Sequence, residues 1–166
     1  GAKALYALDN LWDGLGALVV INPDIKYLFG KVTMYPQFNE EARDLLMYFM
    51  ETYFPDRKNL VKPLEHLNLG YKTDISKYIG VFDGLNYKDG YKVLNKHIRE
   101  LGENIPPLIN TYMNLSPTML TFGTALNDEF GEVEETGILI TLEDIYLPKK
   151  ERHISTFERD KFFVEK

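Results

Sequence analysis

Acidic side chains gather in one stretch of the sequence, and a carboxylate is a group that can accept a proton from a substrate. The run contains Asp128, Glu129, Glu132, Glu134 and Glu135. Glu134 and Glu135 lie where a strand candidate starts, so either carboxylate could bind a substrate ammonium or act as a general base. Burial there would raise its pKa toward a useful range. A solvated hairpin tip is the simpler explanation of the same run.

A second stretch, residues 105 to 124, mixes polar and apolar side chains closely. Asn110, Tyr112 and Asn114 alternate with prolines, leucine and methionine. Polar groups set among flexible apolar ones suit a pocket for a chain with a polar end. Core packing with ordinary capping groups explains the same pattern, so both interpretations stay open.

A short basic run follows at the C-terminal side, where Lys149, Lys150 and Arg152 lie within an otherwise acidic protein. Local charge steers association more directly than total charge, so these side chains could bind phosphate or an acidic protein. The alternative is a solvated segment at the exit of the last strand.

Composition and motifs exclude several other kinds of chemistry. The 166 residues contain no cysteine, which rules out cysteine nucleophiles, cysteine-based zinc sites and disulfides. The three histidines are scattered, and no phosphate-binding loop, dinucleotide fingerprint or serine elbow occurs. The formal net charge of −6 argues against a nucleic-acid partner. We therefore expect no metal, no cofactor and no nucleic acid.

The ends and the apolar runs of the chain bear on its location. The apolar stretch from Gly14 to Ile21 is far shorter than the roughly 20 residues that span a bilayer. No basic segment followed by an apolar one opens the chain, which indicates a cytoplasmic protein. Because the chain begins with Gly1 and enters a helical pattern without a capping residue, we expect a fragment of a longer protein.

Periodicity predicts the elements that must position these side chains. Helices are expected at residues 4–21, 39–54, 91–101 and 106–113, and strands at 25–35, 118–126 and 136–145, with a weaker one at 78–82. Gly14 and Gly16 each weaken the first helix by about 1 kcal/mol relative to alanine. The strand at 25–35 has apolar side chains on both faces, which is typical of a central strand covered by helices. The last two strands form an antiparallel pair, so the fold class is α/β or α+β.

The sequence also resembles a known family, on the segment from Ile105 to Leu115, IPPLINTYMNL, and on the two strands after it. It looks like the C-terminal half of the hemolysin-named family of bacterial ornithine-lipid and glycine-lipid N-acyltransferases. These are GNAT-like enzymes related to acyl-homoserine-lactone synthases. The segments LWDGL and YLFGKV are similar to a helix and a strand of that family. The form of residues 114–117 and 134–137 is most like the Bacteroidetes members.

The resemblance implies a fold and an activity. The fold would be the C-terminal portion of a GNAT-like acyl-CoA or acyl-ACP N-acyltransferase, with a mixed sheet flanked by helices and the terminal strand pair. Residues 1–148 would form this portion and residues 149–166 a charged tail. The enzyme would move a long acyl chain from acyl carrier protein to the amino group of an amino acid, without a cofactor. A lipid product is compatible with peripheral contact at the inner membrane.

Site residues follow from the same resemblance. Glu134 or Glu135 would deprotonate the amine, and Tyr112 would protonate the leaving thiolate. Substrate binding is expected at Trp12, Phe29, Asn110, Asn114 and Phe122, and binding of the acidic carrier protein at Lys149, Lys150 and Arg152. The alternatives are a lipid- or protein-binding module without activity and a synthase of the acyl-homoserine-lactone type.

One part of the family pattern is missing. The family's E-L-[GS]-R strand, which carries much of the active site, would lie before Gly1. Activity of this chain alone is therefore in doubt. A half-sheet with an unpaired edge can pair with a second copy, so we also expect a homodimer.

Overall fold

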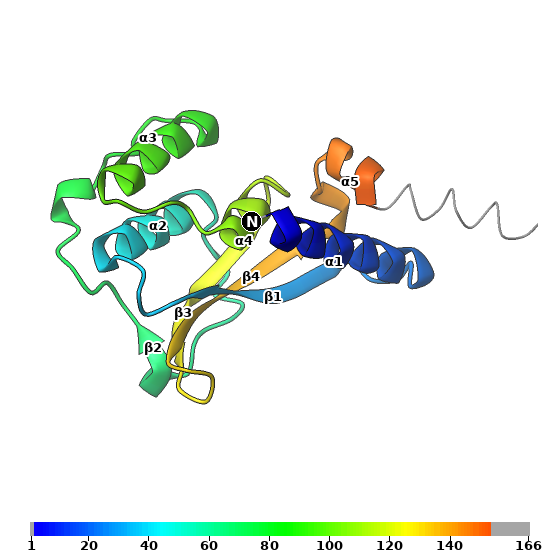
Figure 1. The fold of residues 1–166 in the computed structure, drawn as a ribbon, viewed down its shortest axis with the longest axis horizontal. Coiled ribbons are helices and arrows are strands. Elements are labelled where there is room, and N and C mark those ends of the chain that lie inside the picture. The colour runs from blue at the N-terminus through cyan, green and yellow to red at the C-terminus, as the bar shows by residue number, and fades with distance from the viewer. Residues whose placement is uncertain (1, 154–166) are drawn as a thin grey trace, which may run out of the picture.

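The computed structural model describes residues 2–153, which fold into helices and one antiparallel sheet (Figure 1). Residues 154–166 of the expected charged tail lie outside the described part. The helices are α1 (Ala2–Ile21), α2 (Glu40–Tyr53), α3 (Tyr87–Glu100), α4 (Pro107–Met113) and α5 (Leu147–His153). The strands are β1 (Tyr27–Met34), β2 (Asn68–Leu69), β3 (Leu120–Asn127) and β4 (Val133–Thr141). The α+β class is confirmed, and the arrangement is compatible with a GNAT-like fold.

The strand order across the sheet is β1-β4-β3-β2, and each neighbouring pair is antiparallel. The predicted terminal pair is present as β3 and β4. In the register, Met34 of β1 lies opposite Glu134 of β4, and Leu28 lies opposite Ile140. An isolated parallel bridge joins Pro55 to Thr121 outside these ladders.

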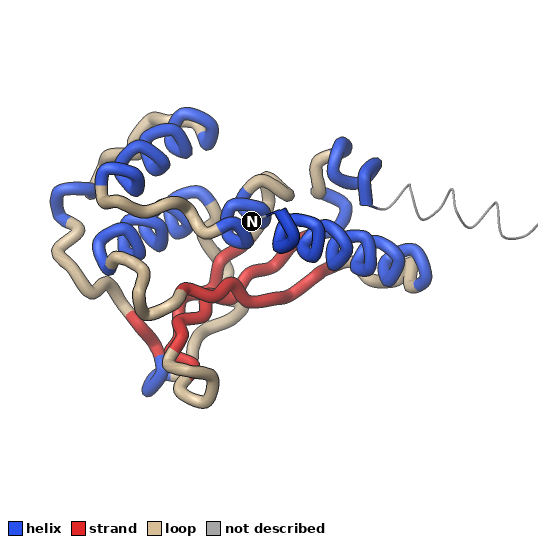
Figure 2. Tube along the Cα trace, viewed as in Figure 1, coloured by secondary structure: helices blue, strands red, loops and turns tan. Residues whose placement is uncertain are grey.

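One face of the sheet is covered by helices, and the other carries exposed side chains. Val32, Met34, Ile138 and Ile140 point into the core, which is completed by apolar side chains of α2, α3 and α4. In Figure 2 the α-helices lie above the strands. On the opposite face, Tyr27 and Phe29 are more than half exposed. We call this second surface the open face of the sheet.

The position of β1 corrects an expectation. Apolar residues on both of its faces predicted a central strand, but β1 is an edge strand whose odd-numbered side chains lie on the open face. The sequence pattern shows only that both faces of this strand are apolar, and it does not show what covers them. The expected strand at 78–82 is also wrong. Gly80 and Gly84 adopt positive φ there and form turns, with a 3₁₀ helix at Ser76–Tyr78.

Local chemistry explains where the helices begin. The side chain of Asn39 accepts a hydrogen bond from the N–H of Ala42 at 3.0 Å, which caps α2 as its sequence predicts. Asn86 caps α3 in the same way through the N–H of Asp89. Proline opens α4, where a missing N–H removes no helical hydrogen bond. None of the helices within residues 2–153 is long and apolar enough to span a membrane.

A bulge at Gly123 sets the faces of β3. The register gains one residue in β3 between Phe122 and Thr124. Gly123 has φ of 53°, and a Cβ there would lie 3.0 Å from the ring of Pro63. Only glycine accommodates both conditions without strain. The bulge thereby allows Thr121 and Thr124 to be buried on the same side of the sheet.

Candidate functional site

A groove lies between the end of β1 and the segment that leads into α4. Its volume is about 570 Å³, which is in the range of small-molecule sites. Most of its lining is apolar, with a few polar groups: Met34, Tyr35, Phe38, Pro106, Pro107 and Leu108 together with Thr33, Gln37, Glu103 and Asn104. We call it the β1–α4 groove. It includes the start of the 105–124 stretch, where the sequence indicated a pocket for a chain with a polar end.

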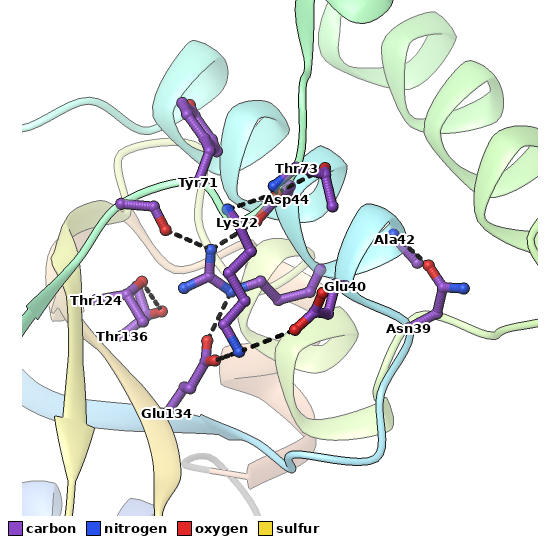
Figure 3. A network of polar contacts seen from close by, with 12 residues as sticks. Asn39, Glu40, Ala42, Asp44, Tyr71, Lys72, Thr73, Thr124, Glu134 and Thr136 are labelled. Carbon is purple, nitrogen blue, oxygen red and sulfur yellow. Dashed lines mark hydrogen bonds and ion pairs between the residues drawn. The ribbon is translucent and has the colours of Figure 1, made fainter.

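A cluster of four charged side chains lies next to this groove; Arg43, Asp44 and Glu134 in it are buried, whereas Lys72 is exposed. Nε of Arg43 lies 2.6 Å from Oε2 of Glu134, and its Nη1 lies 2.6 Å from Oδ1 of Asp44. Nζ of Lys72 lies 2.6 Å from the other oxygen of Glu134. Figure 3 shows this cluster between α2, β4 and the segment that carries Lys72. We call these four residues the Arg43 cluster.

Backbone groups complete the cluster. Oδ2 of Asp44 accepts hydrogen bonds from the N–H groups of Lys72 and Thr73 and from the Thr73 hydroxyl. The carbonyl oxygen of Gly70 accepts one from Nη1 of Arg43 at 2.7 Å. Because each carboxylate has cationic or N–H partners, its burial is compensated. The cluster therefore fastens the segment 70–73 to α2 and to the sheet.

The groove and the cluster share a wall. Met34 lines the groove and lies opposite Glu134 in the register of β1 and β4, on the same helix-covered face. A substitution at Glu134 would therefore affect the shape of the groove through its neighbour Met34. Behind the cluster, the hydroxyls of Thr124 and Thr136 are 2.7 Å apart and buried.

The two glutamates that the sequence singled out lie on opposite faces of the sheet. Glu134 is 4% exposed within the Arg43 cluster, with a cation on each of its oxygens. Glu135 lies on the open face and forms an ion pair with Lys31. The hydrogen bond from Lys31 lowers the pKa of Glu135, and burial opposes this effect only in part. The expectation of a raised pKa is therefore wrong for Glu135, whose pKa is lowered overall although burial alone acts to raise it.

Tyr112 lies on α4, apart from both glutamates. Its ring contacts Trp12 of α1 edge to face, with 5.3 Å between the centroids. Burial raises the pKa of Tyr112, so its hydroxyl is protonated at neutral pH. None of the hydrogen bonds found among the described residues joins it to Glu134 or Glu135. The structure does not bring the three expected catalytic residues together.

Asn110 and Asn114 connect two helices. The hydroxyl of Tyr91 donates to Oδ1 of Asn110 at 2.7 Å, and that of Tyr87 donates to Oδ1 of Asn114 at 3.1 Å. Nδ2 of Asn114 donates to the same Asn110 oxygen at 2.9 Å. These contacts hold α3 against α4, which in turn supplies Pro107 and Leu108 to the groove.

The remaining predicted binding residues lie in three places. Phe29 and Phe122 stack on the open face with 5.9 Å between their centroids. Trp12 lines a small cavity of about 30 Å³ beneath α1, and Lys149 and Lys150 line it as well. Nζ of Lys150 donates to the carbonyl oxygen of Glu143 at 2.5 Å, whereas Arg152 is exposed on α5. These residues do not line the β1–α4 groove.

The sequence reasoning missed Arg43, Asp44 and Lys72. Arg43 lies one and two turns before Met47 and Met50, on an apolar side of α2, and a charge there is a signal of a buried pair. Lys72 lies in a stretch without periodicity, which gave no signal. Within the described residues, no group of three side chains suited to a metal ion was found.

Two curated proteins match nearly the whole chain. A glycine N(alpha)-acyltransferase of Bacteroides thetaiotaomicron is 55% identical over 157 residues, which are 95% of this chain and 46% of that protein. A protein of the same name from Phocaeicola vulgatus is 52% identical, over 95% of this chain and 48% of that protein. No family model and no solved structure matches. The chain spans about half the length of the curated relatives it matches.

Proposed function

We propose that the whole protein is an N-acyltransferase that moves a long acyl chain from acyl carrier protein to the amino group of glycine. The observation that carries the proposal is the identity of 55% and 52% to two proteins named glycine N(alpha)-acyltransferase, over 95% of the chain. Their name favours glycine over ornithine as the acceptor. The carrier-protein donor comes from the family resemblance.

The β1–α4 groove is suited to the acyl chain. Its volume of about 570 Å³ and its lining of methionine, phenylalanine, prolines and leucine fit a long apolar ligand. The polar groups Thr33, Gln37, Glu103 and Asn104 would lie near the polar thioester end. The groove is open rather than enclosed, which suits a chain that arrives on a protein carrier.

The reaction requires little beyond proton transfer and orientation. The glycine nitrogen attacks the thioester carbonyl, a C–N bond forms, the C–S bond breaks, and the carrier thiolate takes up a proton. Glu134 or Glu135 would accept the amine proton, and Tyr112 is the predicted donor to the thiolate, although none of the hydrogen bonds among the described residues joins it to either glutamate. Both oxygens of Glu134 are engaged by cations, so we favour a positioning role for Glu134 and the proton-accepting role for Glu135.

The first experiment is an assay of the purified whole protein with a palmitoyl-loaded bacterial acyl carrier protein and ¹³C-glycine. The expected product is N-palmitoylglycine that carries the label, detected by mass spectrometry. An absence of labelled product from the folded protein, or labelling from ornithine instead of glycine, would contradict the proposal.

A groove variant tests where the chain binds. Leu108→Trp fills part of the groove, so a mixture of acyl carrier proteins with different chains should yield shorter products. Leu60→Trp, at an exposed leucine outside the groove, is the matched control and should leave the chain-length distribution unchanged. An unchanged distribution in both variants would place the acyl chain elsewhere.

A further inference from the structure

The solvent side of α3 carries a regular row of cations. Lys88, Lys92, Lys96 and Arg99 follow one another at helical spacing, and all four are exposed. The other side of α3 is apolar, with Gly90, Leu94 and Ile98 buried, and α3 packs against α2. By helix geometry the row spans about 16 Å. We call these four residues the α3 basic face.

This charge contrasts with the rest of the protein. The formal net charge of the whole chain is −6. On α3, the four basic residues outnumber the two acidic ones, Asp89 and Glu100. A local positive field within an acidic protein attracts an acidic partner.

Two cations of the α3 basic face form ion pairs within α3 that a partner's carboxylates could replace. Lys92 pairs with Asp89 at 2.8 Å and Lys96 with Glu100 at 3.8 Å, and the side chains of these pairs are between 48% and 73% exposed. Ion pairs between such exposed side chains contribute little to stability, because water and salt screen them. Carboxylates of a partner could therefore take the place of Asp89 and Glu100 in these ion pairs at a small cost in free energy. A shallow depression of about 460 Å³ runs along Lys92, Asn95, Lys96 and Arg99.

The basic face leads to the β1–α4 groove. After α3 the chain turns at Gly102, and the next two residues, Glu103 and Asn104, line the groove. Oε1 of Glu103 accepts a hydrogen bond from the N–H of Asn39 at 3.1 Å, which fixes this turn against the start of α2. Figure 1 shows α3 as the outer helix of the pair that it forms with α2. A partner bound along α3 would have the groove at its end.

The side chains on this face favour a protein over a membrane as the partner. Helices that bind membranes insert apolar residues beside their cations. Between residues 86 and 129, the structure shows no large apolar side chain that is exposed. The α3 basic face thus offers charge without an apolar anchor.

We propose that the α3 basic face is the docking surface for an acidic acyl carrier protein, which then delivers its acyl chain into the β1–α4 groove. This inference rests on the proposed function, and it places the carrier on α3 instead of on α5. Lys149 and Lys150 of α5 line the cavity beneath α1, and their helix has seven residues. The α3 face is longer and adjoins the groove.

The test is a binding titration of the whole protein with fluorescently labelled palmitoyl acyl carrier protein. The variant Lys92→Gln/Lys96→Gln/Arg99→Gln should weaken binding at least about tenfold and raise KM for the carrier with little change in kcat. Glutamine retains good helix propensity, and circular dichroism verifies the fold. Lys58→Gln/Lys62→Gln is the control at two exposed lysines elsewhere, and it should bind as the unchanged protein does. Affinity of the unchanged protein should also fall as salt rises.

Three other outcomes would overturn the inference. Equal binding by the α3 variant shows that the carrier docks elsewhere, and a loss confined to Lys149→Gln/Lys150→Gln assigns it to α5. If the α3 variant loses affinity for vesicles with anionic lipid but not for the carrier, the face contacts a membrane. Because labelled N-acylglycine is measured separately, the proposed function can hold while this inference fails, and carrier binding without product would contradict the function alone.

Discussion

Arg43 and Glu134 form a buried ion pair between α2 and β4, with 2.6 Å between Nε and Oε2. The two residues are 91 positions apart in the sequence, and both are at most 4% exposed. The pair joins α2, which begins just after groove residues 33–38, to β4, whose Glu134 lies opposite the groove residue Met34. Its integrity therefore bears on both stability and the shape of the site.

Breaking this pair should be costly. Arg43→Met leaves Glu134 and Asp44 buried with fewer cationic partners, and we expect a loss of about 3–5 kcal/mol in the free energy of unfolding. Urea unfolding measures this loss. The double variant Arg43→Met/Glu134→Leu should lose less than the sum of the single variants, because no carboxylate at 134 remains unpaired. Additive losses would show that the pair is not coupled.

Two glycines within helices should respond oppositely to alanine. A Cβ at Gly90 would lie 2.0 Å from the hydroxyl of Tyr53, whose ring packs against Phe49 and Tyr87. Gly90→Ala should therefore lower the melting temperature, by a loss of about 1–3 kcal/mol. A Cβ at Gly14 would meet no atom within 4 Å apart from its chain neighbours and the backbone of its own helix, so Gly14→Ala should gain up to about 1 kcal/mol from helix propensity. Calorimetry measures the change in melting temperature of both variants, and two changes of the same sign would contradict the described packing.

Lys31 controls the titration of Glu135. Because the hydrogen bond from Lys31 lowers the pKa of Glu135, its contribution to stability is present above the ordinary pKa of about 4.3. That contribution is lost as the pH falls through the lowered pKa. Lys31→Gln should raise the pKa of Glu135, which NMR titration measures directly. The control is Lys26→Gln, at an exposed lysine outside this ion pair.

The same variant tests the proton-accepting role. If Glu135 accepts the amine proton, the acid limb of kcat/KM in Lys31→Gln should move to higher pH along with the pKa of Glu135. A limb that stays in place while the pKa moves would remove Glu135 from the mechanism. Glu135→Gln should then also retain nearly full turnover, whereas the proposal expects a loss of at least about tenfold.

Asn114 should act on stability more than on substrate affinity. Asn114→Ala removes the acceptor of the Tyr87 hydroxyl and leaves that half-buried group without it, at a cost of about 1–3 kcal/mol. Chemical denaturation measures the loss, and Tyr87→Phe in the same chain should recover part of it. A large rise in KM for the acyl donor with unchanged stability would instead support the predicted substrate-binding role.

Helices α1 to α4 and the final strand pair could be predicted because their signals are local, whereas α5 falls where only a charged tail was expected. The cap at Asn39, the proline that opens α4 and the apolar stripe of α3 specify their elements from a few neighbouring residues. The edge position of β1 was not predictable in this way. It depends on the order in which distant strands pair, and residues 27–34 carry no local signal of that order.

The candidate site was only partly predictable for a related reason. The segment around Pro106 and Leu108 was recognised as a pocket wall, because mixed polar and apolar residues in one stretch are visible in the sequence. The Arg43 cluster draws on α2, β4 and an irregular segment, so its members are brought together only by the tertiary fold. The sequence placed Glu134 and Glu135 at the start of a strand, but it did not show that the cations of Arg43 and Lys72 surround one of them.

The bulge at Gly123 has a consequence for comparisons between sequences. Within β3 the extra residue shifts the alternation of faces by one position. Thr121 and Thr124 therefore share a face, although one number is odd and the other even. A relative with a regular strand at this point would need a one-residue gap opposite Gly123. Aligned without that gap, all of its residues opposite 124–127 would be assigned to the wrong side of the sheet.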